Sequence, residues 1–312
     1  MNPPAIRWPE GRRFAFTIFD DPDSQTLAAN RAVYDLLSDL GFRTTIGVWP
    51  NAADPARRSD HGETCGNPEY VRRLLHLQEG GFEIAFHNAT SHTSTRAETL
   101  AGFERFAELF GHDPYSMANH YHCQEGLYWA ENRLTGINRA AYTVLTRGRQ
   151  RGRFTGHIPG SPEFWGDYAR DRVRYVRNFV FGEIDTLRAC PWMPYHDPAR
   201  PYVNLWFAGS EGAQAPAFID MLREENQERL EQEGGCCIMY THFGIGYWND
   251  GRLEPRFVEL MKRLARRNGW FVPAYVLLDE IQRQRGPVTL TPRDRAKLER
   301  RWLFHKIRYG SA

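Results

Sequence analysis

Short apolar runs alternate with segments of helical periodicity along most of the chain. Runs typical of buried strands lie at 14–19, 44–49, 82–86, 203–207 and 236–241. Segments whose apolar residues recur at the spacing of amphipathic helices lie at 25–40, 69–81, 96–110, 214–232 and 255–267. This alternation predicts a parallel sheet whose strands are joined by right-handed helical crossovers.

Other stretches carry weaker patterns. Residues 115–118 and 141–145 are weak strand candidates, and 269–284 is typical of a last strand followed by a helix. Residues 146–180 are rich in arginine, glycine and aromatic residues, and their pattern predicts no element. Together the units predict an α/β fold, a distorted TIM-like (β/α) barrel of about seven or eight strands over residues 1–290.

The segment 291–312 is basic, with interleaved aromatic residues. Thr291 followed by Pro292 is typical of the start of a helix, so we expect a basic C-terminal helical tail. The favoured interpretation is a terminal helix docked on the barrel with a solvated basic face. The alternative is contact with a membrane surface or an anionic carrier.

Composition supports a packed core and disfavours two classes of partner. The 312 residues are 41% hydrophobic and 25% charged, which suits one folded barrel. The formal net charge of +2 gives no electrostatic reason to expect a nucleic acid as the main partner. No stretch approaches the ~20 apolar residues of a transmembrane helix.

The N-terminus and the cysteines predict a cytoplasmic protein with reduced thiols. Residues 1–13 contain no apolar run of the kind found in secretory signals. The five cysteines are odd in number and scattered, and a bond between the adjacent Cys236 and Cys237 would be strained. No CxxC pair supports a thiolate zinc site. The oligomeric state stays open, a homo-oligomer included.

Polar side chains follow the predicted strands at their carboxyl ends. They are Asp20 and Asp21 after 14–19, His87 and His92 after 82–86, His120 and His122 after 115–118, and His242 after 236–241. A parallel barrel gathers these strand ends on one face, where active sites of that architecture lie. This convergence is the strongest functional indication in the sequence.

Each of these residues also has a plainer interpretation. Asp20 and Asp21 face one site only if the strand ends there, which Pro22 favours; otherwise they belong to a solvated turn. His87 and His92 are five residues apart, too far for one helical face, so they converge only through a loop. His242 suits a general acid but equally a core histidine bonded to the backbone.

The order of these pieces resembles the polysaccharide deacetylase family, carbohydrate esterases of the NodB-homology type. The segment T-I-F-D-D at 17–21 is similar to its first motif, and 80–92, G-G-F-E-I-A-F-H-N-A-T-S-H, to its second. Y-T-H at 240–242 is similar to the last motif, and the likeness spans about 12–284.

The resemblance implies a catalytic apparatus. A divalent metal, zinc by preference with cobalt, nickel or manganese as alternatives, would be held by Asp21, His87 and His92. Asp20 would be the general base and His242 the general acid. The implied reaction is hydrolysis of an acetamide or acetyl ester on a sugar.

Two departures from the family stand out. Its histidine pair is normally four residues apart, and its third motif, Arg-x-Pro-aromatic-Gly, is absent: the corresponding stretch 117–123 reads M-A-N-H-Y-H-C. The arginine that would orient the base is therefore missing. The candidates for that role and for substrate binding are Asn119, His120, His122 and Arg188, and those for pairing with His242 are Asp185 and Asp197.

The leading functional hypothesis is a metal-dependent hydrolase that removes an acetyl group from an N-acetylated sugar or glycan precursor. One alternative keeps the chemistry but acts on a non-sugar amide. The other is a catalytically inactive, deacetylase-like barrel that serves as a binding protein in polysaccharide biosynthesis. The missing third motif is the main support for that last alternative.

Overall fold

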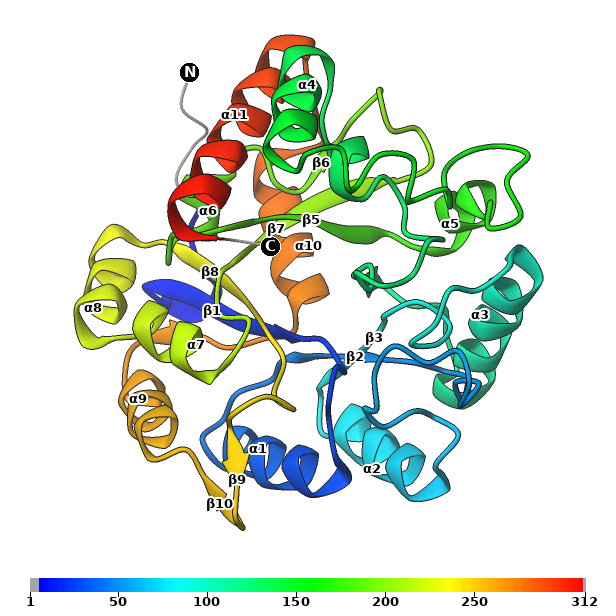
Figure 1. Cartoon of the computed structure of the whole chain (residues 1–312). Coiled ribbons are helices and arrows are strands. Elements are labelled where there is room, and N and C mark those ends of the chain that lie inside the picture. The colour runs from blue at the N-terminus through cyan, green and yellow to red at the C-terminus, as the bar shows by residue number, and fades with distance from the viewer. Residues whose placement is uncertain (1–5, 311–312) are drawn as a thin grey trace.

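Seven parallel strands close into a barrel in the computed structural model, which describes residues 6–310 (Figure 1). In barrel order they are β1 (Phe14–Asp20), β2 (Thr45–Val48), β3 (Glu83–Phe86), β4 (Ser116–Met117), β5 (Tyr175–Phe181), β7 (Leu205–Ser210) and β8 (Cys236–Thr241). β8 pairs with β1 from Ala15 opposite Cys236 to Asp20 opposite Thr241, and this pairing closes the ring. The predicted TIM-like α/β barrel is confirmed.

Helices surround the ring, as Figure 1 shows. The longer ones are α1 (Leu27–Asp39), α2 (Pro68–Glu79), α3 (Arg96–Phe110), α4 (Gly136–Leu145), α8 (Glu224–Glu233), α9 (Pro255–Ala265), α10 (Ala274–Arg285) and α11 (Pro292–Tyr309). The shorter ones are η1 (Pro9–Gly11), η2 (Ala130–Arg133), α5 (Gly166–Arg172), α6 (Thr186–Ala189) and α7 (Ala215–Met221). Some begin at a capping side chain: Thr95 and Glu98 form a reciprocal capping box at α3.

Short strands extend the sheet outside the ring. β11 (Gly269–Trp270) pairs with β1, β6 (Tyr195–His196) runs antiparallel to β7, and β12 (Val288–Thr289) pairs with β6. β9 (Trp248–Asn249) and β10 (Arg252–Leu253) form a separate hairpin. Every residue of β1, β5 and β8 is buried, as expected for parallel strands covered on both faces.

Three predictions about elements are corrected. Residues 141–145 end helix α4, because Tyr142 packs on Trp302 of α11 with ring centroids 5.7 Å apart. The stretch that predicted no element contains β5, a full barrel strand. The single helix expected at 214–232 is two, α7 and α8, because Arg223 adopts extended backbone between them.

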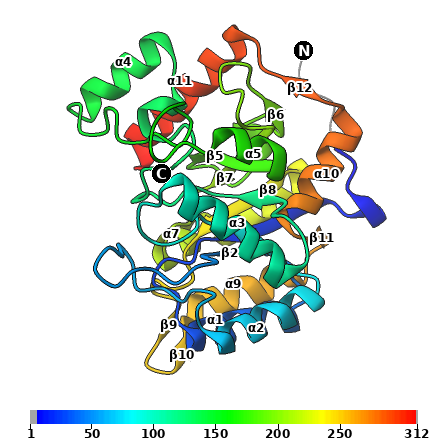
Figure 2. The ribbon, with the colours of Figure 1, turned by 90° about the vertical axis from the view of Figure 1, so that its right-hand side faces the viewer.

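The C-terminal helix α11 is docked, as the favoured interpretation of the tail predicted. Thr291 caps it and Pro292 opens it, while Leu298, Trp302 and Leu303 join the common core. Figure 2 shows α11 and α4 together at one corner of the molecule. The boundary at residue 290 stays a prediction.

Residues 1–5, where the N-terminal segment begins, and residues 311–312 of the tail lie outside the described part of the chain. All five cysteines are described, and each is buried and free. Within residues 6–310, no helix is long and apolar enough to cross a membrane.

Candidate active site

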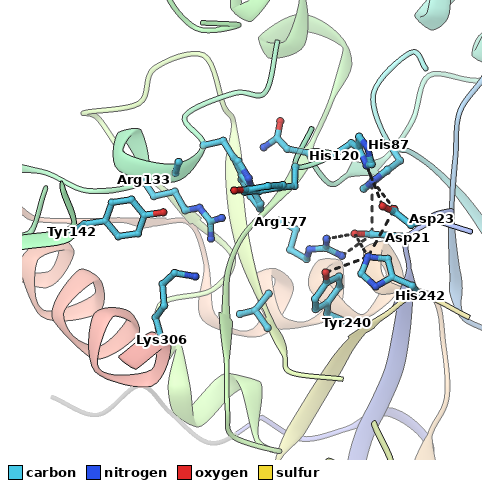
Figure 3. A pocket seen from close by; sticks show the side chains of 15 residues that line it. Asp21, Asp23, His87, His120, Arg133, Tyr142, Arg177, Tyr240, His242 and Lys306 are labelled. Atoms are coloured by element: carbon cyan, nitrogen blue, oxygen red, sulfur yellow. Dashed lines mark hydrogen bonds and ion pairs between the residues drawn. The ribbon is translucent and has the colours of Figure 1, made fainter. Parts of the chain in front are cut away.

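A pocket of about 190 Å³ opens at the carboxyl ends of the barrel strands (Figure 3). Its lining residues are Asp21, Asp23, His87, Asn119, His120, Tyr121, Trp129, Ala130, Arg133, Tyr142, Arg177, Val180, Tyr240, His242 and Lys306. Figure 3 shows the carboxylates and histidines at one end, and Arg133, Tyr142 and Lys306 at the other. The pocket therefore has two ends. We call the first, with atoms able to ligate a metal, the donor end, and the second the cationic end.

At the donor end, Asp23, His87 and His120 present ligand atoms to a common point. Nε2 of His87 lies 3.5 Å from Oδ2 of Asp23, and Nδ1 of His120 lies 3.3 Å from Oδ1 of Asp23. The two histidine nitrogens are 3.4 Å apart. Asp23 Oδ2 and His87 Nδ1 are buried without a hydrogen-bond partner among the described residues. Two imidazoles and one carboxylate with unsatisfied atoms are a donor set that suits a divalent metal.

The ring of His120 is oriented by contacts on its far side. Its Nε2 lies 3.1 Å from Oγ of Ser59, and its backbone N–H donates to Oδ1 of Asn88 at 2.7 Å. The ring of Trp49 packs edge-on against it, with centroids 5.3 Å apart. Such outer contacts fix which nitrogen of a ligand histidine faces the site. Here Nδ1 faces Asp23 and His87.

Asp23 is placed by a tight turn after β1. Ser24 has a left-handed backbone (φ 55°), and its N–H donates to Oδ1 of Asp60 at 2.6 Å. Gly244 lies against this turn: a Cβ there would be 2.3 Å from Ser24 C and 2.5 Å from Asp23 O. Burial raises the pKa of Asp23, but its interactions with the nearby His120 and His87 outweigh burial and hold this pKa well below its usual value.

Asp21 is held by an arginine from across the barrel. Nη1 and Nη2 of Arg177 donate to its two carboxylate oxygens at 2.9 and 2.5 Å. The Arg177 guanidinium lies 5.1 Å from the ring centroid of Phe19 and 4.3 Å from that of Tyr240. A buried, two-point pair of this kind fixes the carboxylate in one orientation. Arg177 thus orients a pocket carboxylate, whereas the resemblance assigned such a role to the arginine of the absent third motif.

His242 faces the same end of the pocket. Its Nδ1 lies 2.7 Å from the carbonyl oxygen of Ala213, which can only accept, so Nδ1 carries a proton. Nε2 therefore points inward, 3.2 Å from the hydroxyl of Tyr240, 3.8 Å from Asp23 Oδ2 and 4.0 Å from Asp21 Oδ2.

Asp20 points away from the pocket, because successive strand residues face opposite sides. One oxygen accepts the Phe243 N–H at 2.7 Å, and the other accepts the Tyr34 hydroxyl at 2.7 Å and Nε2 of Gln25 at 3.2 Å. Burial raises the pKa of Asp20 well above its usual value, although these hydrogen bonds partly offset it. The structure therefore gives Asp20 the position of an anchor between β1, α1 and the loop after β8.

The structure does not bring His92, His122 or Arg188 to the donor group. His92 Nδ1 lies 3.0 Å from the Thr90 hydroxyl and 3.1 Å from the Thr93 carbonyl, because the loop after β3 turns its ring away. His122 lies beside His120, outside the pocket lining. Arg188 is on the surface, paired with Glu183 and Glu233.

Asn119 lines the pocket, yet its amide bonds the backbone of Leu127 in both directions, at 3.2 and 2.8 Å. Asp185 accepts the backbone N–H groups of Arg188 and Cys236, and Asp197 pairs with arginines. Neither of these carboxylates contacts His242.

Sequence reasoning missed several residues of the pocket: Asp23, Tyr142, Arg177, Tyr240, Arg133 and Lys306. Asp23 had a signal, since it continues the Asp-Asp-Pro-Asp run past the proline that ends the strand. Arg177 had a fainter one, as the single charged residue within the apolar run 175–181. The residues of the cationic end carried no local signal.

No protein-family model and no curated protein matches the chain. Among solved structures, PuuE allantoinase is similar over 90% of this chain and 94% of its own, with 13% identity and a TM-score of 0.51. A protein described as a polysaccharide deacetylase from Mycobacterium smegmatis is similar over 93% and 98%, with 15% identity and a TM-score of 0.51. A protein described as a polysaccharide deacetylase from Pseudomonas aeruginosa PAO1 is similar over 91% of this chain and 95% of its own, with 14% identity and a TM-score of 0.50. At such identities the likeness is one of fold, and it confirms that the chain has the barrel of these hydrolases.

Proposed function

We propose that the protein is a metal-dependent hydrolase of a C–N bond, one that removes the acetyl group from an N-acetylated sugar or glycan precursor. The observation that carries this proposal is the convergence of Asp23, His87 and His120 beside an arginine-held Asp21. The fold shared with deacetylases and an allantoinase supports it.

The ligand set that the geometry favours is Asp23, His87 and His120, in place of Asp21, His87 and His92. Zinc, cobalt, nickel or manganese suits two imidazoles and a carboxylate. When bound, such an ion polarises a carbonyl and lowers the pKa of coordinated water. The proposed roles of the aspartates change accordingly. Asp23 replaces Asp21 as the metal ligand, and Asp21 replaces Asp20 as the general base.

Asp21 suits the general base because it faces the pocket and has a fixed orientation. Its Oδ1 lies 3.6 Å from Nδ1 of His87, and its Oδ2 lies 4.0 Å from Nε2 of His242. Arg177 acts as a positioning residue that keeps both oxygens in place. In this role Asp21 would take a proton from water and hold it on its carboxylate, within the same small pocket as the leaving group.

His242 suits the general acid that protonates the leaving amine. The Ala213 carbonyl holds the Nδ1 proton, so the proton delivered to substrate is the one on Nε2. The Tyr240 hydroxyl lies 3.2 Å from Nε2 and orients the ring toward the pocket.

Metal content and acetate release test the proposal together. The full-length protein is loaded with zinc or cobalt, and bound metal is measured in the wild type and in His120→Ala and His92→Ala, a matched pair of buried histidines. We expect about stoichiometric metal in the wild type and in His92→Ala, and its loss in His120→Ala. Metal lost in His92→Ala and kept in folded His120→Ala would restore the motif-based ligand set. No metal in the loaded wild type would overturn the metallohydrolase.

A second candidate is hydrolysis of a compact non-sugar amide. The pocket volume of about 190 Å³ favours it, since it is smaller than the ~300 Å³ and more of most ligand sites. The substrate that is hydrolysed distinguishes the two: acetamido sugars with release of acetate, or compact non-sugar amides tested in parallel. Against the inactive binding barrel, we propose that Arg177 supplies the orienting role of the missing arginine, since it pairs with Asp21.

A further inference from the structure

We propose that the cationic end of the pocket, formed by Arg133, Tyr142 and Lys306, is a binding subsite for an anionic group on the substrate. This inference rests on the proposed function, because it names the class of amide that the same pocket takes. The substrate would be an acetamide, or a related amide, that also carries a carboxylate or a phosphate.

Arg133 is the residue that carries the inference. It is 4% exposed, and within residues 6–310 no carboxylate forms an ion pair with it. Its Nε has no hydrogen-bond partner there, and Nη1 makes only a long contact of 3.4 Å to the Asn178 carbonyl. A buried guanidinium with unmet donors is costly unless an anion satisfies it. Burial lowers the pKa of Arg133 to about 10.

The guanidinium is held in place and aimed into the pocket (Figure 3). It lies 3.5 Å from the ring centroid of Trp129 and 5.0 Å from that of Trp302. Within the segment leading to it, Tyr128 (φ 47°) and Ala130 (φ 50°) adopt left-handed backbone. Such backbone strain in non-glycine residues concentrates at functional sites.

A second cation comes from the other end of the sequence. Lys306 of α11 lines the same end of the pocket, with Nζ 5.4 Å from the ring centroid of Trp302. Tyr142 adds a hydroxyl from α4. The carboxylates that line the pocket, Asp21 and Asp23, both lie at the donor end. The pocket is therefore polarised along its length, with cationic donors facing any substrate group that lies away from the reacting carbon.

The chemistry recognised is an anionic oxygen group, since arginine and lysine donors suit carboxylate and phosphate alike. Both groups place several acceptor oxygens on one centre, so one such group can accept from Arg133 and Lys306 together. A neutral amide would leave the Arg133 donors unmet and would bind less well.

The first experiment measures anion binding without catalysis. Full-length, metal-free protein is titrated with inorganic phosphate and, separately, with propionate, at constant ionic strength, by calorimetry. We expect saturable binding of at least one anion, weakened by about tenfold or more in Arg133→Met. Arg149→Met, which removes an exposed arginine from the same region, is the matched control and should bind as the wild type does. Phosphate alone, propionate alone, or both, would each support the subsite and name its chemistry.

Equal binding by Arg133→Met and the wild type, with both proteins folded by circular dichroism, would overturn the subsite. So would the failure of both anions to bind the wild type. Arg133→Lys keeps a charge but loses the planar fork, so partial recovery in that variant separates loss of charge from loss of packing on Trp129.

The second experiment keeps the subsite separate from the proposed function. Metal-loaded protein is assayed with N-acetylglucosamine, its 6-phosphate and N-acetylmuramic acid. We expect kcat/KM to favour an anionic substrate by about tenfold or more, and Arg133→Met to abolish the preference. Hydrolysis with no charge preference would overturn the subsite and keep the function. A third outcome is a protein that hydrolyses none of the three and still binds anions in a way that depends on Arg133. That result would support the subsite and overturn the sugar-deacetylase function.

Discussion

The donor end and the cationic end of the pocket are built in different ways. The donor end comes from the carboxyl ends of β1, β3, β4 and β8, where any parallel barrel collects side chains. The cationic end comes from η2, α4 and α11, which lie outside the repeating strand–helix units. The first follows from the architecture, and the second follows from how two peripheral helices dock on it. Variants that affect one end and spare the other test this division.

The largest effect is expected at Asp21, compared with its neighbour Asp20. Asp21→Asn removes the proposed base and should lower kcat by about a thousandfold, within the range for general bases. Asp20→Asn alters an anchor that faces away from the pocket, so kcat should fall by less than about tenfold while thermal stability drops. Acetate release and thermal unfolding of both variants measure this. A deeper loss of kcat in Asp20→Asn would return the base role to Asp20.

The next effect concerns the arginine that holds Asp21. Arg177→Met should lower kcat by about a hundredfold and, because it leaves a buried carboxylate unpaired, lower stability by about 3 kcal/mol. Metal content should stay, since Arg177 forms its ion pair with Asp21 and with none of the three favoured ligands. Arg174→Met, whose side chain pairs with Asp279 on the outside, is the control. An active Arg177→Met would show that Asp21 needs no positioning.

The docking of α11 is tested at Glu299, which connects this helix to α4 beside the cationic end. Its buried carboxylate accepts from Thr135, Asn138 and Arg200. Glu299→Gln should weaken anion binding by about tenfold through displacement of α11, and metal content should remain. Glu259→Gln, on the exposed face of α9, serves as the control. Loss of metal together with anion binding in a folded Glu299→Gln would mean that the two ends are not independent.

The smallest effect is a pH dependence at Lys306. Burial, with a further contribution from Arg133, lowers its pKa to about 8, while Glu211 acts in the opposite direction. The lysine loses its charge as pH rises through this value, so anion affinity should fall by about threefold between pH 7 and 9. Lys306→Met should remove that dependence and leave a weaker, flatter binding curve. A dependence that persists in Lys306→Met would assign it to another group.

Much of the barrel was predictable because its strands are apolar runs and its helices have clear periodicity. α3 begins and ends where the pattern placed it, at Arg96 and Phe110. β5 was missed because an arginine and an asparagine interrupt its apolar run. Arg177 is buried against Asp21 across the barrel, and buried Asn178 contacts Tyr195 of β6. Helix α4 resembled a strand because 141–145 is a short apolar run, but its buried residues Asn138 and Tyr142 are four positions apart, the spacing of one helical face.

By itself the sequence determined the α/β barrel and placed His87 and His242 at one face, since strand ends of a parallel barrel converge whatever the loops do. The sequence also placed His120 near them, but as a candidate for substrate binding and not as a metal ligand. Only the tertiary structure decided that Asp20 turns outward, that Asp21 pairs with Arg177, and that Asp23 faces the histidines. The reason is geometric: each of these depends on a turn or on a contact between residues more than a hundred positions apart, as from Asp21 to Arg177. The cationic end was the least predictable from local sequence, because Arg133 and Lys306 line one pocket only when α11 is docked on the barrel.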